Sequence, residues 1–111
     1  MVLYHVTHKS NVSSILKEGL IPMTGYLADA GWEFRDAVYF FKELDEGFQK
    51  DINGWMTIAY PRDQQVLLKV TLPDEFGAYG GLKERWDWEV VCYKKVPPSC
   101  IEIIPFPEIS A

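Results

Sequence analysis

The sequence of 111 residues contains only two cysteines and two histidines, and neither CxxC nor HExxH, the spacings typical of zinc sites, occurs in it. Two cysteines, Cys92 and Cys100, are too few for the disulfide framework of a small secreted domain. The sequence leaves open whether these two residues pair with each other. We therefore expect a cytoplasmic protein with reduced thiols and no bound metal.

Runs of one charge and long apolar runs are also missing. The 11 lysines and arginines are scattered, and 16 acidic residues give a formal net charge of −5. This balance disfavours non-specific binding to nucleic acids and to anionic membranes. The longest apolar runs, such as 66–68, are far too short to span a bilayer. The opening VLYHVT lacks the basic and apolar regions of a signal peptide, so we expect no membrane association.

Hydrophobic and aromatic residues, in contrast, are plentiful, at 48% and 14% of the chain. Such a composition is typical of a folded protein and not of a disordered one. A chain of this length can build one hydrophobic core, so we expect residues 1–111 to form a single domain. The aromatic content exceeds the need of a small core, which indicates that some rings line a pocket.

The N-terminal part of the chain predicts a strand followed by a short helix. Residues 2–6 alternate in polarity and are rich in β-forming residues. Ser10 or Asn11 can cap a helix, and Gly19 is the expected left-handed residue at its end. The apolar stripe of this helix consists of Val12, Ile15 and Leu16.

The rest of the chain predicts four more strands, a second helix and two long loops. The strands are expected at 37–41, 65–72, 89–94 and 101–104. The helix within 43–60 places on one face, expected to be core, the residues Phe48, Ile52, Trp55 and Ala59. Residues 23–36 and 73–87 have no sustained period, and loops of this length are often functional. This order of elements predicts an α+β fold.

Three polar residues, His5, Tyr39 and Glu89, lie in or at the edge of otherwise apolar predicted strands. A carboxylate beside apolar bulk either faces solvent on an edge strand or is held in a pocket. A lone histidine on an apolar strand is more often a core residue with one hydrogen bond than a ligand contact. The residues alone do not show that these three side chains meet.

Three segments of the chain resemble the ADP-ribosyltransferase superfamily. LYHVTHKSNVSSILKEGLIP, residues 3–22, resembles its opening, in which an aromatic-His-x-Thr strand precedes a helix ending in Gly-Leu and a proline. AVYFF, residues 37–41, resembles its tyrosine-bearing strand. WEVVCYKKVPPSCIEII, residues 88–104, resembles the block in which a glutamate starts a strand. The resemblance implies a split β-sandwich of two small antiparallel sheets with two helices and an NAD cleft between the sheets.

The resemblance also implies a role for each matching residue. His5 would hydrogen-bond the adenosine-side ribose of NAD, with Thr7 close by, and Tyr39 would stack on the nicotinamide ring. Glu89 would hold the 2′-hydroxyl of the nicotinamide ribose and stabilise positive charge as the glycosidic bond breaks. The implied activity is mono-ADP-ribosylation, which transfers ADP-ribose from NAD to a protein or nucleic-acid acceptor without a metal.

Acceptor recognition in this family involves the loop before the glutamate, which implies roles for Tyr79, Trp86, Asp87 and Trp88. Asp87 stands where many toxins of the family carry Glu or Gln. The acceptor itself is not indicated. A macrodomain-type antitoxin is the protein partner that the resemblance suggests.

Two other functions are compatible with the same sequence. The first is a binding module or inhibitor of the same fold without turnover, with contact residues Trp32, Tyr79, Trp86 and Trp88. The second is an RNA 2′-phosphotransferase, a related branch that holds a phosphate with histidine and several arginines. The sequence fits that branch less well, because its only arginines are Arg35, Arg62 and Arg85.

Overall fold

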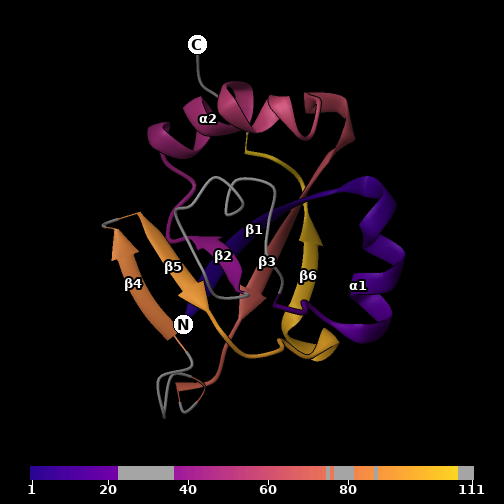
Figure 1. The fold of residues 1–111 in the computed structure, drawn as a ribbon, viewed down its shortest axis with the longest axis vertical. Helices are drawn as coiled ribbons and strands as arrows, with labels where there is room; N and C mark the ends of the chain where they lie inside the picture. The colour runs from indigo at the N-terminus through magenta and orange to yellow at the C-terminus, as the bar shows by residue number, and fades with distance from the viewer. Residues whose placement is uncertain (23–36, 75, 77–81, 87, 108–111) are drawn as a thin grey trace.

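The structure, a computed structural model, describes residues 1–22, 37–74, 76, 82–86 and 88–107 (Figure 1). These residues form an α+β fold with one six-stranded antiparallel sheet of order β4-β5-β2-β1-β3-β6. The strands are β1 (Val2–His8), β2 (Val38–Phe41), β3 (Gln65–Thr71), β4 (Leu82–Trp86), β5 (Glu89–Cys92) and β6 (Ile101–Ile104). The helices are α1 (Val12–Glu18) and α2 (Glu46–Asn53), with 3-10 turns η1 (Lys9–Asn11), η3 (Trp55–Ile58), η4 (Arg62–Gln64) and η6 (Pro98–Cys100).

The sheet is divided at its centre. Strand β1 pairs with β3 along its whole length, from Val2↔Thr71 to His8↔Gln65. With β2, in contrast, it pairs only at Tyr4↔Phe41. The sheet therefore consists of two three-stranded halves, β4-β5-β2 and β1-β3-β6, which can diverge on either side of this single pair (Figure 1).

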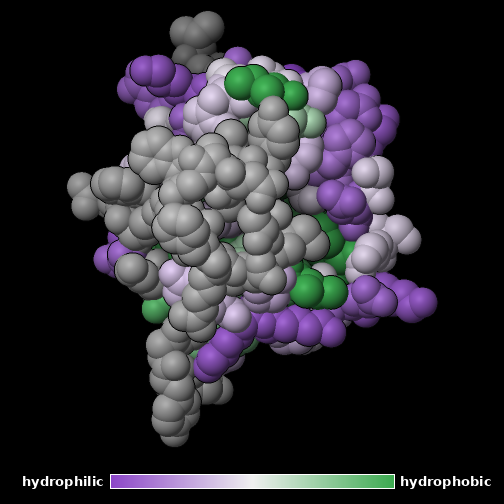
Figure 2. All heavy atoms as spheres, in the orientation of Figure 1, coloured by the Kyte–Doolittle hydropathy of each residue, from purple (hydrophilic) through white to green (hydrophobic). Residues whose placement is uncertain are grey.

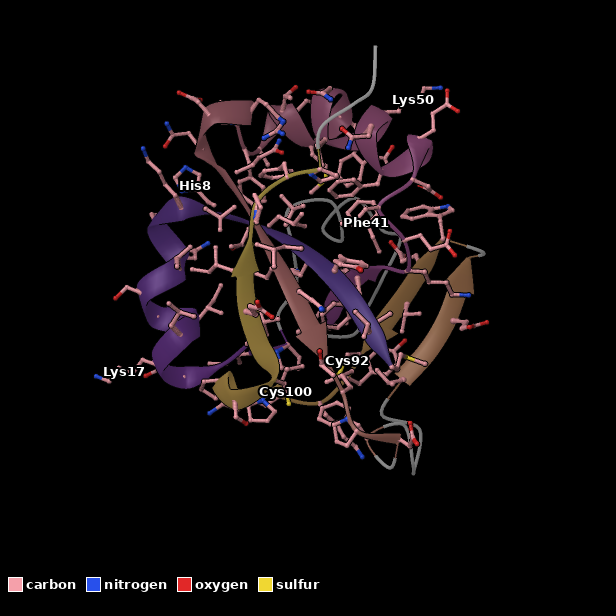
Figure 3. All side chains as sticks on the ribbon, turned by 180° about the vertical axis from the view of Figure 1, so that it is seen from behind. His8, Lys17, Phe41, Lys50, Cys92 and Cys100 are labelled. Carbon is pink, nitrogen blue, oxygen red and sulfur yellow. The ribbon has the colours of Figure 1, made fainter. Side chains whose placement is uncertain are left out.

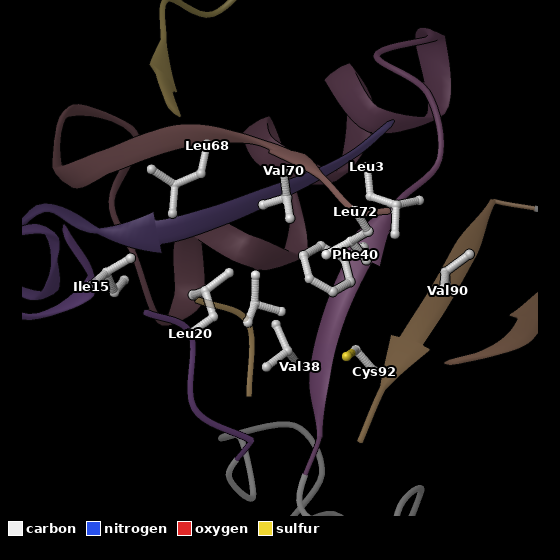
Figure 4. Close-up of a cluster of buried hydrophobic side chains, with 11 residues drawn as sticks. Leu3, Ile15, Leu20, Val38, Phe40, Leu68, Val70, Leu72, Val90 and Cys92 are labelled. Carbon is white, nitrogen blue, oxygen red and sulfur yellow. The ribbon is translucent and has the colours of Figure 1, made fainter. Parts of the chain in front are cut away.

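One face of the sheet carries the larger hydrophobic cluster, which the helix α1 covers with Ile15 (Figure 4). Phe40 and Val90, which pair on neighbouring strands, belong to it with 1% of their surface exposed. Apolar residues at alternate positions of four strands build the cluster, as the period of a β-strand requires. Its other members include Leu3, Val38, Leu68, Val70, Leu72 and Cys92.

Gly19 ends α1 with φ of +90°, which confirms the sign of φ in the prediction, whereas its ψ of −173° lies outside the left-handed helical region. Its N–H donates to Ile15 O at 2.7 Å, and the next residue, Leu20, exchanges two backbone hydrogen bonds of 2.9 Å with Val96. A Cβ atom at position 19 would overlap the carbonyl oxygen of Val96. Only glycine therefore fits where the end of α1 meets the segment before β6.

The opposite face carries a second cluster, which α2 covers with Phe48 and Ile52. Phe41 of β2 lies beneath α2, with its ring centroid 5.0 Å from that of Phe48 (Figure 3). The Asp45 carboxylate caps α2 by accepting the N–H of Phe48 at 2.9 Å. The cluster also contains Val6, Met56 and Leu67.

The expected core face of the second helix was wrong in its C-terminal half. The helix ends at Gly54 and continues as the 3-10 turn η3, so the helical period of 3.6 residues stops there. Trp55 is 41% exposed and Ala59 is also exposed, whereas Met56 is buried in their place.

The expectation of a loop throughout 73–87 was also wrong, because residues 82–86 form strand β4. Among the described strands, β4 lies at the edge of the sheet and pairs with β5 alone. An edge strand needs no alternation of apolar residues, so the charged sequence LKERW does not predict a strand.

The first helix begins after Asn11, one of the two residues expected at its cap, but the capping hydrogen bond in this region comes from another residue. His8 is half-buried and caps η1, because its Nδ1 accepts the N–H of Ser10 at 3.1 Å. Asn11 occupies the N-cap position of α1 but makes no side-chain capping bond.

Cys92 is buried and Cys100 half-buried, and both are free thiols. The described residues include no helix with the length and apolar character needed to cross a membrane. On the face in Figure 2, hydrophobic side chains surface in separate small areas, at the top near α2 and beside β6.

Candidate functional site

The three polar residues singled out in the sequence lie on three neighbouring strands. His5 is on β1, Tyr39 on β2 and Glu89 at the start of β5, and these strands are consecutive in the sheet. All three residues lie close to the Tyr4↔Phe41 pair at which the two halves of the sheet meet. The topology therefore brings together residues that are up to 84 positions apart in the sequence, from 5 to 89.

The His5 imidazole bridges the two halves of the sheet. Its Nδ1 lies 2.8 Å from the carbonyl oxygen of Tyr39. A carbonyl oxygen can only accept a hydrogen bond, so Nδ1 carries the proton and donates it. The imidazole thus connects β1 to β2 beyond the point where their backbone ladder ends.

The environment of His5 keeps the imidazole neutral. Burial lowers the pKa of His5, and the hydrogen bond to Tyr39 O opposes this effect only in part. The edge of the ring meets Phe40, at a centroid separation of 5.8 Å, so one wall of its surroundings is apolar. With Nδ1 protonated, the neutral ring presents Nε2 as a hydrogen-bond acceptor.

Tyr39 and Glu89 share one face of the sheet. Tyr39 pairs with Val91, and Phe41 pairs with Glu89, so the two polar residues are diagonal neighbours within reach of each other. The Tyr39 hydroxyl and Glu89 Oε1 are both buried oxygens. A phenol and a carboxylate buried together on apolar strands form the polar part of the candidate site.

His5 belongs to the other face by strand alternation, because its partner on β3 is Leu68 in the larger cluster. Its contact with Tyr39 is accordingly to the main chain and not to the ring. A ligand that touches the side chains of His5, Tyr39 and Glu89 must therefore lie across the division between β1 and β2.

Thr7 lies two residues beyond His5 on the same face of β1 and is only 4% exposed. Its hydroxyl accepts a long hydrogen bond of 3.5 Å from Asn11 Nδ2, at the start of α1. Thr7 therefore lies near His5, and its hydroxyl connects β1 with the first helix.

Trp88 lies directly before Glu89. Of the four residues expected in acceptor recognition, it is the one whose side chain the structure describes. It is 43% exposed, and its indole lies against Phe41 with ring centroids 5.9 Å apart. Tyr79 and Asp87 lie outside the described residues, as do Trp32 and Arg35. Trp86 and Arg85 are described only as backbone positions of β4.

Of the three arginines, Arg62 is the one whose side chain belongs to the described part of the structure. Arg62, whose side chain can be placed, lies over the Phe106 ring, 3.8 Å from its centroid. Among the described residues there is also no cluster of three or more His, Cys, Asp or Glu side chains that could hold a metal ion.

The sequence did not indicate two polar interactions, of which the first lies near the site. Lys42, immediately after β2, forms an ion pair with Glu84 of β4, with Nζ and Oε1 2.8 Å apart. Gln65 is buried at the start of β3, and its Nε2 donates to Ile52 O and Tyr60 O, both at 2.9 Å. The only signal for Gln65 was its polar side chain ahead of an apolar strand, and Lys42 had none.

No protein-family model, no curated protein and no solved structure matches this chain. Functional inference therefore rests on the residues and on their geometry.

Proposed function

We propose that this protein has an ADP-ribosyltransferase-like split β-sandwich fold and acts as a mono-ADP-ribosyltransferase. It would cleave NAD, release nicotinamide and transfer ADP-ribose to a protein or nucleic-acid acceptor. The observation that carries the proposal is the position of His5, Tyr39 and Glu89 on three adjacent strands at the division of the sheet, with His5 bonded to the main chain of Tyr39.

Glu89 supplies the electrostatic part of the reaction. Cleavage of the bond between nicotinamide and ribose passes through a state with positive charge on the ribose ring. A carboxylate held at the start of β5 and partly enclosed by protein stabilises this charge without reorganising. Tyr39, on the same face, offers a flat ring that suits the nicotinamide.

The hydrogen bonding of His5 indicates whether its side chain can bind a ribose hydroxyl or a phosphate group. Because Nδ1 donates to Tyr39 O, a neutral His5 can only accept a hydrogen bond through Nε2. A ribose hydroxyl donates such a bond, whereas a phosphate dianion has no proton to donate. The neutral His5 ring with its proton on Nδ1 therefore favours a ribose hydroxyl of NAD over the phosphate ligand of a 2′-phosphotransferase.

One observation favours the second candidate, a binding module without turnover. Trp88 is a large aromatic side chain that is 43% exposed beside the site, and tryptophan is a common anchor of protein interfaces. A module of this kind would need neither the Glu89 carboxylate nor NAD. A thermal-shift measurement separates the two candidates, because NAD in excess over its dissociation constant raises the melting temperature only where it binds.

The proposal is tested by following nicotinamide release from NAD by the wild type, Glu89→Gln and Glu102→Gln. Glu102 is exposed on β6 and serves as the control for loss of one carboxylate. We expect Glu89→Gln to slow release by about 100-fold and Glu102→Gln to leave it unchanged. Equal rates for all three proteins would contradict the role of Glu89, and absence of both NAD binding and turnover in the wild type would contradict the function.

A further inference from the structure

Lys42 connects three strands next to the candidate site. It follows β2 directly, and its backbone N–H donates to Trp88 O at 3.0 Å, which extends the β2–β5 pairing by one residue beyond Phe41↔Glu89. Its side chain reaches over to β4, where Nζ lies 2.8 Å from Glu84 Oε1. Lys42 thus bonds both to Trp88, the residue before Glu89, and to the edge strand β4.

The ion pair lies where the β4–β5 pairing is irregular. Glu84 pairs with Val90 and Trp86 pairs with Glu89, and the register shifts between these two pairs. Such a bulge interrupts the ladder and loosens the local pairing of an edge strand. Glu89 is therefore paired, on its β4 side, with the less regular end of that strand.

The pair does not lie on the face of Tyr39 and Glu89 but on the face to which His5 also belongs. Glu89 pairs with Phe41, so their side chains share a face. The next residue, Lys42, continues the ladder through its N–H, so strand alternation assigns it to the other face. Glu84 pairs with Val90, which also belongs to that other face. The ion pair therefore crosses β5 on the side opposite the Glu89 carboxylate, where it can fix the strand.

We propose that Lys42 is a positioning residue: its ion pair with Glu84 fastens the β4–β5 hairpin and so fixes the direction of the Glu89 carboxylate. This inference rests on the proposed function of Glu89. The Lys42 side chain is 27% exposed and the Glu84 side chain 67%, so the pair contributes little to global stability. Its effect appears instead in local opening of the hairpin and in the catalytic step, because small displacements of a catalytic group are costly.

The test compares Lys42→Met with the charge-exchanged double variant Lys42→Glu/Glu84→Lys in the NAD cleavage assay. We expect Lys42→Met to lower kcat about tenfold with KM for NAD changed by less than about twofold. The double variant restores the ion pair and should recover at least half of the lost kcat. Lys17→Met removes an exposed lysine that points away from the sheet in Figure 3 and should leave kcat unchanged.

An unchanged kcat in Lys42→Met would overturn the inference, and so would a double variant as slow as the single one. A wild type without NAD turnover would contradict the proposed function and not the fastening of the hairpin. Amide hydrogen exchange then decides the latter without NAD: Lys42→Met should exchange faster at position 42 and in 82–86, and the double variant should not. Equal exchange in wild type and Lys42→Met would overturn it.

Discussion

Replacement of Gly19 by alanine should destabilise the protein strongly, although it adds a single methyl group. Gly19 has φ of +90°, a conformation that costs an L-residue roughly 1–2 kcal/mol. The added Cβ would overlap Val96 O, the acceptor of one of the two hydrogen bonds between Leu20 and Val96. Each backbone bond contributes about 1 kcal/mol, so losing both brings the expected total to about 3–4 kcal/mol.

The free energy of unfolding, measured by urea denaturation, gives the result. Gly47→Ala is the matched control, because its Cβ would meet only the side-chain Oδ1 of Asp45, at 3.3 Å, and not a backbone atom. At this helical position alanine should change the free energy of unfolding by less than about 1 kcal/mol, because its higher helix propensity opposes the close contact with Asp45 Oδ1. A loss below about 1 kcal/mol in Gly19→Ala would refute the reasoning from φ and from the contact with Val96.

Three further predictions concern pH, packing and thiol chemistry. Because the pKa of His5 is lowered by burial, the folded protein resists its protonation. The free energy of unfolding should be highest above pH 6.5, the ordinary pKa of histidine, and should fall as the pH is lowered through the lowered pKa of His5. His5→Gln should reduce this fall, as measured by urea denaturation at several pH values. Replacement of Ile52, which is 0% exposed, by alanine should lower the free energy of unfolding by about 2–5 kcal/mol. The same replacement of Ile58, which is 71% exposed, should lower it by less than about 0.5 kcal/mol. Cys100, half-buried, should react with an aromatic disulfide reagent before Cys92, because burial shields the Cys92 thiol and raises its pKa; faster labelling of Cys92 in single-cysteine variants would contradict this.

Much of the fold could be predicted from periodicity and end signals. The strands at 2–8, 38–41, 65–71, 89–92 and 101–104 and both helices were expected at these places, within a few residues at their ends. Gly19 was identified because few other residues tolerate a positive φ. Local signals of this kind are sufficient wherever one face of an element is buried.

Other parts of the fold depend on contacts that local sequence does not encode. Strand β4 is stabilised by pairing with β5, and its charged residues resemble those of a loop. Trp55 was placed in the core because a single helix was assumed to continue through Gly54. The order of the strands in the sheet could not be predicted from the sequence either, because it depends on long-range pairing.

The candidate site shows the same limit. His5, Tyr39 and Glu89 could be selected as polar residues in apolar strands, and by resemblance, but their proximity follows only from the order β5-β2-β1. The bond from His5 Nδ1 to the Tyr39 carbonyl was not foreseeable, because it requires the backbone pairing of β1 and β2 to stop after Tyr4.

The most direct measurement of the central claim is the nitrogen NMR spectrum of the two histidines with and without NAD. Without NAD, His5 should be neutral with the proton on Nδ1, and His8 should show the opposite tautomer, because its Nδ1 accepts the N–H of Ser10. Addition of NAD should shift the Nε2 resonance of His5, as expected for a new hydrogen bond from a ribose hydroxyl, and leave that of His8 in place. A proton on Nε2 of His5, or no shift at saturating NAD, would contradict the account.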